Sequence, residues 1–177
     1  MTNGGDGHGG GVVLRRMRWW DIEPVLALEA ELFPLDAWSE GMYWSELAGA
    51  GGPRRTRGYV VAEDADGKLA GYAGLSVAGE TGDVMTIGVT GAHQGTGLGG
   101  RLLAEVLADA RRLGCREVLL EVRVDNERAQ RLYTRFGFRR IGVRRGYYQP
   151  GNFDALVMRR ELAADADEEP GETTEHG

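Results

Sequence analysis

Residues 84–103 read VMTIGVTGAHQGTGLGGRLL, and they indicate more about the architecture than any other segment of the chain. Its first part is typical of a β-strand, its middle is the glycine-rich run QGTGLGG, and an amphipathic helix pattern follows at once. Glycine lets the backbone adopt positive φ and approach a ligand closely. A helix N-terminus presents unpaired N–H groups and partial positive charge. We therefore predict that backbone N–H groups of Gly95 to Gly100 hold the pyrophosphate of a cofactor.

The sequence of this glycine loop (residues 94–100) has to be compared with two nucleotide-binding motifs. A P-loop requires GxxxxGK[ST], and no Lys-Ser/Thr pair follows. The run GTGLGG at 95–100 does match the GxGxxG of a Rossmann unit, and Glu117 and Glu121 lie roughly 20 residues further on. A lone GxGxxG is weak evidence, and a long segment precedes this loop. The loop by itself leaves a dinucleotide site open.

The length, the apolar runs and the cysteine content of the chain limit the class of protein to which it can belong. Its 177 residues suffice for one domain with a substantial core. No apolar run reaches transmembrane length, and the N-terminus has no signal-peptide pattern. One cysteine, Cys115, excludes an internal disulfide, and no Cys/His cluster has metal-ligand spacing. We expect a cytoplasmic protein with no membrane span and no metal.

The net charge of −6 comes from the ends of the chain. Residues 12–162 hold all 21 Lys and Arg residues and all but seven of the 27 acidic ones, so the body is nearly neutral. This balance does not favour nucleic-acid binding. The composition predicts a disordered glycine-rich tail over 1–11, one domain over 12–162 and a disordered acidic tail over 163–177.

The first half of the chain predicts a strand, two helices and an antiparallel meander. Asp21 and Ser39 are expected to cap the two helices, and the turn sequence DADG joins two β-rich runs into a hairpin. The expected elements are a strand at 12–17, helices at 22–32 and 40–47, and strands at 58–64, 68–79 and 83–89.

The second half predicts helix, strand, helix and two strands. Gly114 and Gly137 end the helices, and the run Val118 to Leu120 is expected to be buried on both faces of its strand. The expected elements are helices at 98–113 and 127–136 and strands at 116–124, 138–145 and 155–162. A hairpin before the glycine loop is foreign to a Rossmann domain. It favours an α+β fold in α/β/α layers, with about four helices on a mixed, mostly antiparallel sheet of about six or seven strands and one parallel βαβ crossover.

This order of elements resembles the GNAT superfamily of acetyl-CoA-dependent N-acetyltransferases. The loop carries its Q-x-x-G-x-G pattern as Gln94, Gly97 and Gly99, and NERAQRLYTRFGF is similar to its N-x-x-A-x-x-L-Y-x-x-x-G-F helix. Three segments, FPLDAWS, LLEVRVDN and RRGYYQPGNFDALVM, are similar to the RimI family, which acetylates the N-terminal alanine of a small-subunit ribosomal protein.

The resemblance implies a role for each matching residue. Glu121 would be the general base, acting directly or through water, and Tyr133 the general acid for the departing CoA thiolate. Asn126 would contact the cofactor arm near the thioester. The strand end is expected to bury Glu121 among apolar neighbours. The remaining acetyl-CoA contacts are the backbone of Ile87, Gly88 and Val89 for pantetheine, and Gln94, Gly95, Thr96, Gly97, Leu98, Gly99 and Gly100 for the pyrophosphate.

Each of these residues also has a purely structural interpretation. Glu121 can pair with Arg123 or Arg144, Tyr133 lies on an apolar helical stripe, and Asn126 can be a helix cap. The loop also departs from the family, which commonly has Arg or Lys where Gly95 and Gly100 stand. The phosphates would then depend on backbone N–H groups and on Arg101. The departure implies weaker or more salt-sensitive CoA binding.

The resemblance further implies a protein N-terminus as acceptor and a monomer or weak dimer as the active form. Phe33 and Trp38 would form one wall of a peptide groove, and a loop bearing Tyr147 and Tyr148 would form the other. Packing in the core is the alternative for these aromatic residues. A small-molecule N-acetyltransferase for polyamines, amino acids or aminoglycosides stays open, because the first two helices are rich in acidic residues. A non-catalytic acetyl-CoA-binding partner is the other alternative.

Overall fold

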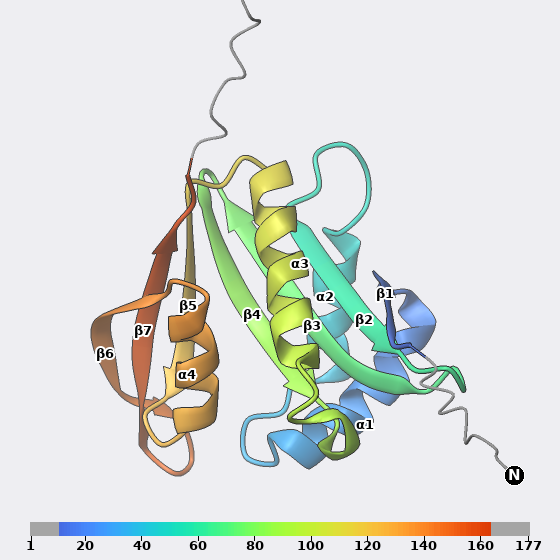
Figure 1. The fold of residues 1–177 in the computed structure, drawn as a ribbon, viewed down its shortest axis with the longest axis horizontal. Helices are drawn as coiled ribbons and strands as arrows, with labels where there is room; N and C mark the ends of the chain where they lie inside the picture. The colour runs from blue at the N-terminus through green and yellow to red at the C-terminus, as the bar shows by residue number, and fades with distance from the viewer. Residues whose placement is uncertain (1–10, 164–177) are drawn as a thin grey trace, which may run out of the picture.

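The computed structural model describes residues 11–163 and contains one seven-stranded sheet with helices on both faces (Figure 1). The strand order is β1-β2-β3-β4-β5-β7-β6, and only the β4–β5 pair is parallel. The strands are β1 Val13–Arg16, β2 Arg57–Glu63, β3 Leu69–Ala78, β4 Thr81–Val89, β5 Glu117–Arg123, β6 Arg139–Tyr148 and β7 Phe153–Glu161. The α-helices are α1 Ile22–Leu32, α2 Glu40–Ala48, α3 Leu98–Arg112 and α4 Glu127–Arg135. Apart from Gly11 and Ala163, the predicted tails lie outside the described residues.

The helices form two layers around the sheet, which confirms the expected α/β/α arrangement. In Figure 1, α3 and α4 lie in front of the sheet and α1 and α2 behind it. The stripe of α3 that the periodicity predicts is buried against β3 and its neighbours, from Leu102 to Ala110. A second cluster around Val25, Tyr43 and Tyr72 joins α1 and α2 to the other face. Two apolar clusters thus hold the sheet between its helices.

The sheet opens in its middle, between β4 and β5. The parallel pairing covers only Thr81–Asp83 on β4 and Glu117–Leu119 on β5. Beyond these residues β4 continues to Val89 along β3, and β5 continues to Arg123 along β7. The two strands therefore diverge at the ends that lead into the glycine loop and into α4.

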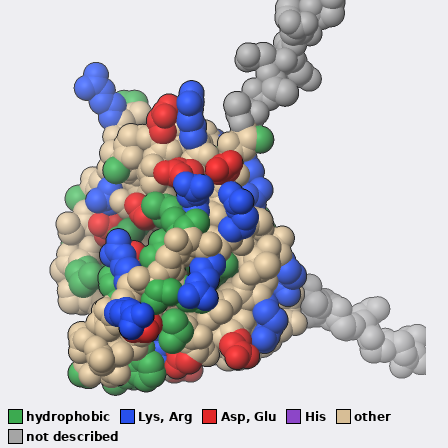
Figure 2. All heavy atoms as spheres, turned by 90° about the vertical axis from the view of Figure 1, so that its left-hand side faces the viewer, with side chains coloured by type: hydrophobic (Ala, Val, Ile, Leu, Met, Phe, Trp, Pro, Cys, Tyr) green, Lys and Arg blue, Asp and Glu red, His purple; other side chains and the backbone are tan. Residues whose placement is uncertain are grey.

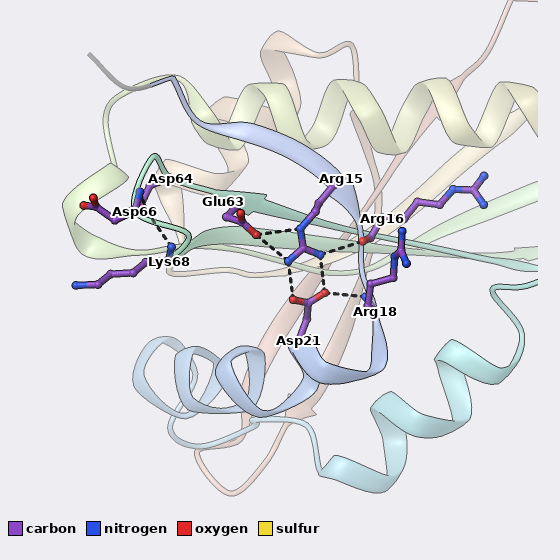
Figure 3. Close-up of polar contacts among 8 residues, drawn as sticks. All are labelled: Arg15, Arg16, Arg18, Asp21, Glu63, Asp64, Asp66 and Lys68. Carbon is purple, nitrogen blue, oxygen red and sulfur yellow. Dashed lines mark hydrogen bonds and ion pairs between the residues drawn. The ribbon is translucent and has the colours of Figure 1, made fainter. Parts of the chain in front are cut away.

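The start of α1 differs from the sequence prediction. Ser39 caps α2 as expected, since its hydroxyl accepts from the Met42 N–H at 3.3 Å, but Asp21 makes no cap bond to α1. Asp21 instead accepts two hydrogen bonds from Arg15, each at 2.8 Å, and one from the Arg18 N–H at 2.7 Å (Figure 3). Arg15 also donates to Glu63, so this network fastens the start of α1 to β1 and β2.

Strand β5 is buried on one face and not on both. Val118, Leu120 and Val122 are buried under α3 and α4, whereas Leu119 and Glu121 on the other face are only half-buried. The reason is that α1 and α2 make their main contacts with β2, β3 and β4. The β5 face that carries Leu119 and Glu121, the predicted general base, is therefore less covered.

Candidate active site

A cavity of about 740 Å³ lies where β4 and β5 diverge, within the range of small-molecule sites. Its walls are the second half of β4, the glycine loop, β5 with α4, and the end of α1 with the following loop. The predicted residues that line it are Phe33, Trp38, Ile87, Gly88, Val89, Gln94, Gly95, Gly97, Gly99, Gly100, Glu121, Asn126, Tyr133 and Tyr148. Thr96, Leu98 and Tyr147 do not line it. The structure thus brings most of the predicted site to one place.

The glycine loop has the backbone that a phosphate site needs. Gly95 and Gly97 have φ of +78° and +86°, and a Cβ at either would meet no atom within 4 Å, so the loop faces open space. Gly97 is the N-cap of α3, whose first N–H groups are therefore free for a ligand. The Leu98 side chain is buried in the core and the Thr96 hydroxyl donates to the His93 carbonyl, so both can offer a ligand only backbone groups.

The end of β4 has the free edge that a pantetheine arm needs. Ile87, Gly88 and Val89 pair with β3 on one side, and their other side faces the cavity because β5 has diverged. A Cβ at Gly88 would lie 2.6 Å from Tyr72 Cε1, so glycine is required here by the ring behind it. The β4 edge and the glycine loop together fit the two parts of acetyl-CoA that the sequence assigned to them.

Glu121 lies in the cavity wall, but it is not buried as the sequence predicted. Its side chain is 30% exposed, because β5 alternates and the apolar neighbours of Glu121 point to the opposite face. Arg144 Nη1 lies 3.3 Å from Oε1, and the Tyr147 hydroxyl donates to Oε2 at 3.3 Å. Of its two proposed partners, Arg144 is the one found, while Arg123 pairs with Asp125. The carboxylate is thus held at the cavity wall and remains partly exposed.

Tyr133 fits both of its interpretations, because it packs in the core and also forms part of the cavity wall. Its ring is buried in the core and packs edge-on against Phe138, with 5.9 Å between centroids, yet it also lines the cavity. Burial raises the pKa of the Tyr133 hydroxyl above its usual value. A tyrosine hydroxyl is already protonated at neutral pH, as a proton donor must be, and the shift keeps it so.

Asn126 likewise has two roles that are compatible. Its side-chain oxygen accepts from the Ala129 N–H at 3.1 Å and so caps α4. The same residue lines the cavity beside Glu121 and Tyr133. The cap fixes where the Asn126 side chain stands at the mouth of the cavity.

The predicted aromatic walls are only partly correct. Phe33, Trp38 and Tyr148 line the cavity, and burial raises the pKa of Tyr148. Tyr147 packs edge-on against Tyr148 outside the cavity, with 5.1 Å between centroids. Both tyrosines end strand β6 and do not belong to a loop, because β6 extends three residues further than predicted. The second wall is thus a strand end.

Sequence reasoning missed a buried carboxylate in the wall of this cavity. Glu29 is 1% exposed and accepts from the Tyr43 hydroxyl and the Thr86 hydroxyl, each at 2.8 Å, and from the Trp38 N–H at 3.3 Å. These donors belong to α2, to β4 and to the loop after α1, so one side chain joins three parts of the site. The available signal was its position four residues after Val25, on the apolar side of the helix.

The arginine side chains that bring positive charge to the cavity are not the one that the sequence predicted. Arg101 does not line the cavity, and its Nη2 donates to the Val12 carbonyl at 2.8 Å. Arg128, Arg131 and Arg135 of α4 line the cavity instead; we call them the arginine row. Figure 2 shows the side of the molecule at the left of Figure 1, where Lys and Arg side chains stand around hydrophobic ones.

A metal-binding cluster and a membrane-spanning helix are both absent from residues 11–163. No group of three or more His, Cys, Asp and Glu side chains is placed to hold a metal ion. Within the same residues, no helix has the length and apolar character needed to cross a membrane.

Comparison with known proteins assigns the family. The Acetyltransferase (GNAT) family model matches residues 19–138. N-alpha-acetyltransferase RimI of Mycobacterium tuberculosis is 42% identical over 146 residues, which cover 80% of this chain and 87% of that protein. The [ribosomal protein bS18]-alanine N-acetyltransferase of Escherichia coli is 34% identical over 95 residues, or 52% of this chain and 64% of that one.

The fold agrees with these sequence matches. The crystal structure of the ribosomal-protein-S18-alanine N-acetyltransferase from Escherichia coli superposes with a TM-score of 0.74 at 24% identity, covering 88% of this chain and 98% of that one. This likeness shows the fold, which in this chain is a seven-stranded mixed sheet with one parallel pair. The chain therefore belongs to the GNAT family of acetyltransferases.

Proposed function

We propose that this enzyme transfers the acetyl group of acetyl-CoA to the N-terminal α-amine of a protein, and that the N-terminal alanine of ribosomal protein bS18 is its acceptor. Membership of the GNAT family implies the cosubstrate. The names of the relatives from M. tuberculosis and E. coli suggest the acceptor. The observation that carries the proposal is that Glu121 and Tyr133 line one cavity between the glycine loop and the aromatic wall.

The chemistry suits these two side chains. An N-terminal amine has a pKa of about 7.7–8.0, so a carboxylate can remove its proton before or during attack. Glu121, held by Arg144 and Tyr147, accepts that proton directly or through a water. Tyr133, whose hydroxyl is protonated at neutral pH, gives a proton to the departing sulfur. The amine attacks the thioester directly, and no covalent enzyme intermediate is required.

The expected preference is for peptides that begin with alanine. In a competition among N-terminal peptides that differ at their first two residues, we expect the alanine peptides to be acetylated fastest, because the E. coli relative is named for acetylating an alanine. CoA release and mass spectrometry of the peptides measure the preference. Free polyamines serve as the competing acceptor class.

A small-molecule acetyltransferase is the second candidate, and one observation favours it. Glu29 and Asp36 both line the cavity and would attract a cationic acceptor. Glu29, however, is buried and already accepts hydrogen bonds from Tyr43, Thr86 and Trp38. A clear preference for polyamines over every N-terminal peptide would overturn the main proposal.

Replacing Tyr133 by phenylalanine separates its proton from its packing. We expect Tyr133→Phe to slow acetyl transfer by about 10²-fold, because a general acid contributes roughly this much, and to leave acetyl-CoA affinity nearly unchanged. Single-turnover rates measure the first effect and calorimetric titration the second. Phe138→Tyr alters a ring of the same buried pair outside the cavity lining and serves as the comparison for packing. Unchanged transfer by Tyr133→Phe would refute the acid role.

A further inference from the structure

The glycine loop brings no basic side chain to the phosphates that it is expected to bind. Residues 94–100 contain no Lys or Arg. Arg101, the next residue, donates to the Val12 carbonyl and does not line the cavity. A helix N-terminus supplies only about half an elementary charge. The several negative charges of a phosphorylated cosubstrate therefore need positive charge from another element.

Helix α4 carries that charge on the side that faces the cavity. The arginine row, Arg128, Arg131 and Arg135, has the spacing i, i+3, i+7, which places its members on one face of a helix. All three residues line the cavity. The row extends about 10 Å along the helix axis, a length comparable to a chain of several phosphate and sugar groups.

The helix that carries the arginine row packs against the end of the glycine loop. A Cβ at Gly99 would be 3.4 Å from Leu132 Cδ2, and a Cβ at Gly100 would be 3.4 Å from the Phe136 ring. Helix α4 is therefore in contact with the first turn of α3. This contact brings the row to the loop where the family commonly has its own basic residues.

One hydrogen-bond chain fixes the inner end of the row. Arg128 Nη1 donates to Gln94 Oε1 at 2.9 Å, and Gln94 Nε2 donates to the Val89 carbonyl at 3.2 Å. Gln94 is the first residue of the glycine loop, and Val89 ends β4. The guanidinium of Arg128 is thus positioned over the loop by a neutral partner that leaves its charge uncompensated.

The rest of the row is also little engaged by acidic side chains. Among residues 11–163 its one ion pair joins Arg131 to Glu127 at 3.8 Å, and both of these side chains are mostly exposed. Such a pair contributes little in water. The guanidinium forks remain available for phosphate oxygens, which they can bind through two parallel hydrogen bonds.

We propose that the arginine row replaces the missing basic residues of the glycine loop and binds the phosphate groups of the cosubstrate. The inference rests on acetyl-CoA as cosubstrate, which is part of the proposed function, but not on the identity of the acyl acceptor. The loop supplies backbone N–H groups, and α4 supplies the charge. Recognition of the phosphates is in this way divided between two helices that contact each other.

Calorimetric titration of acetyl-CoA into the full chain tests the proposal without an activity assay. We expect Arg128→Gln to weaken binding about tenfold, and the triple change of Arg128, Arg131 and Arg135 to glutamine to weaken it more than 100-fold, because each charged hydrogen bond to phosphate is lost. The wild type should lose affinity steeply with salt and the triple variant much less. Arg101→Gln removes the same charge outside the cavity and should bind like the wild type.

Two ligand arms and a stability check complete the experiment. If the penalty of the triple variant disappears with dephospho-CoA, the row holds the 3′-phosphate; if it persists, the row holds the pyrophosphate, and both results support the proposal. Thermal unfolding verifies that each variant folds. A triple variant that binds acetyl-CoA like Arg101→Gln at low salt would overturn the proposal. Arginine-dependent binding without acetylation of any N-terminal peptide would refute the proposed function and leave this inference intact.

Discussion

Replacing Glu121 by glutamine is expected to slow acetyl transfer by about 10²- to 10⁴-fold, the range that a general acid–base group contributes. Glutamine keeps the size of the side chain and can still accept a hydrogen bond from Tyr147, but it cannot take a proton from the amine. Single-turnover transfer to an N-terminal peptide measures the loss. Acetyl-CoA affinity should stay close to that of the wild type, because the glycine loop and β4 are untouched.

Glu117→Gln is the matched control for this change. Glu117 lies on the same strand and the same face as Glu121, and accepts from the Thr81 hydroxyl at 3.0 Å, but it does not line the cavity. We expect this variant to transfer acetyl at the wild-type rate. Equal rates for Glu121→Gln and Glu117→Gln would rule out Glu121 as the base, and a transfer rate that stays undetectable in the wild type would favour a non-catalytic acetyl-CoA-binding partner.

Replacing Glu29 by alanine is expected to lower the free energy of unfolding by about 3–5 kcal/mol. The change removes the acceptor of the Tyr43 and Thr86 hydroxyls in a buried place and leaves a cavity behind. Because Thr86 belongs to the part of β4 that lines the active-site cavity, the remaining folded protein should also bind acetyl-CoA less tightly. Urea unfolding followed by circular dichroism measures the first effect.

Two comparison variants make the result for Glu29 specific. Glu31→Ala changes an exposed glutamate on the same helix and should cost less than about 0.5 kcal/mol. Glu29→Gln keeps the shape and one acceptor oxygen, so its loss should lie between the other two. If Glu29→Ala unfolds at the same urea concentration as Glu31→Ala, the three hydrogen bonds do not stabilise the fold.

Local patterns were enough to predict the layers of this fold. The apolar stripe of α3, its stop at Gly114 and the turn between β2 and β3 are each encoded within a dozen neighbouring residues. Their order along the chain then indicated the single parallel crossover, which distinguishes this sheet from a dinucleotide-binding one. The glycine loop was recognisable for the same reason, since the phosphate binding proposed for it depends on backbone conformation.

The features that were missed depend on contacts between distant segments. Whether Glu121 is buried depends on how far α1 and α2 extend over the sheet, which no pattern in β5 records. The arginine row is visible as a spacing on α4, but its direction is set by the contact of Leu132 and Phe136 with the start of α3. Tyr147 and Tyr148 were placed in a loop because the pairing that extends β6 involves Phe153 across the turn.

The short parallel pairing of β4 with β5 divides the site between two halves of the chain. The loop and the β4 edge, which are suited to hold the cosubstrate, come before residue 101, whereas Glu121, Asn126 and Tyr133 come after the crossover. The parallel ladder between β4 and β5, which joins the two parts of the sheet, contains only three residue pairs. A fragment that ends with α3 would keep the phosphate cradle of the loop but would contain neither member of the proposed acid–base pair. The distance between the cosubstrate and the proposed acid–base pair therefore depends on the angle at which β4 and β5 diverge. Substitutions at this pairing can alter turnover while both sets of site residues stay intact.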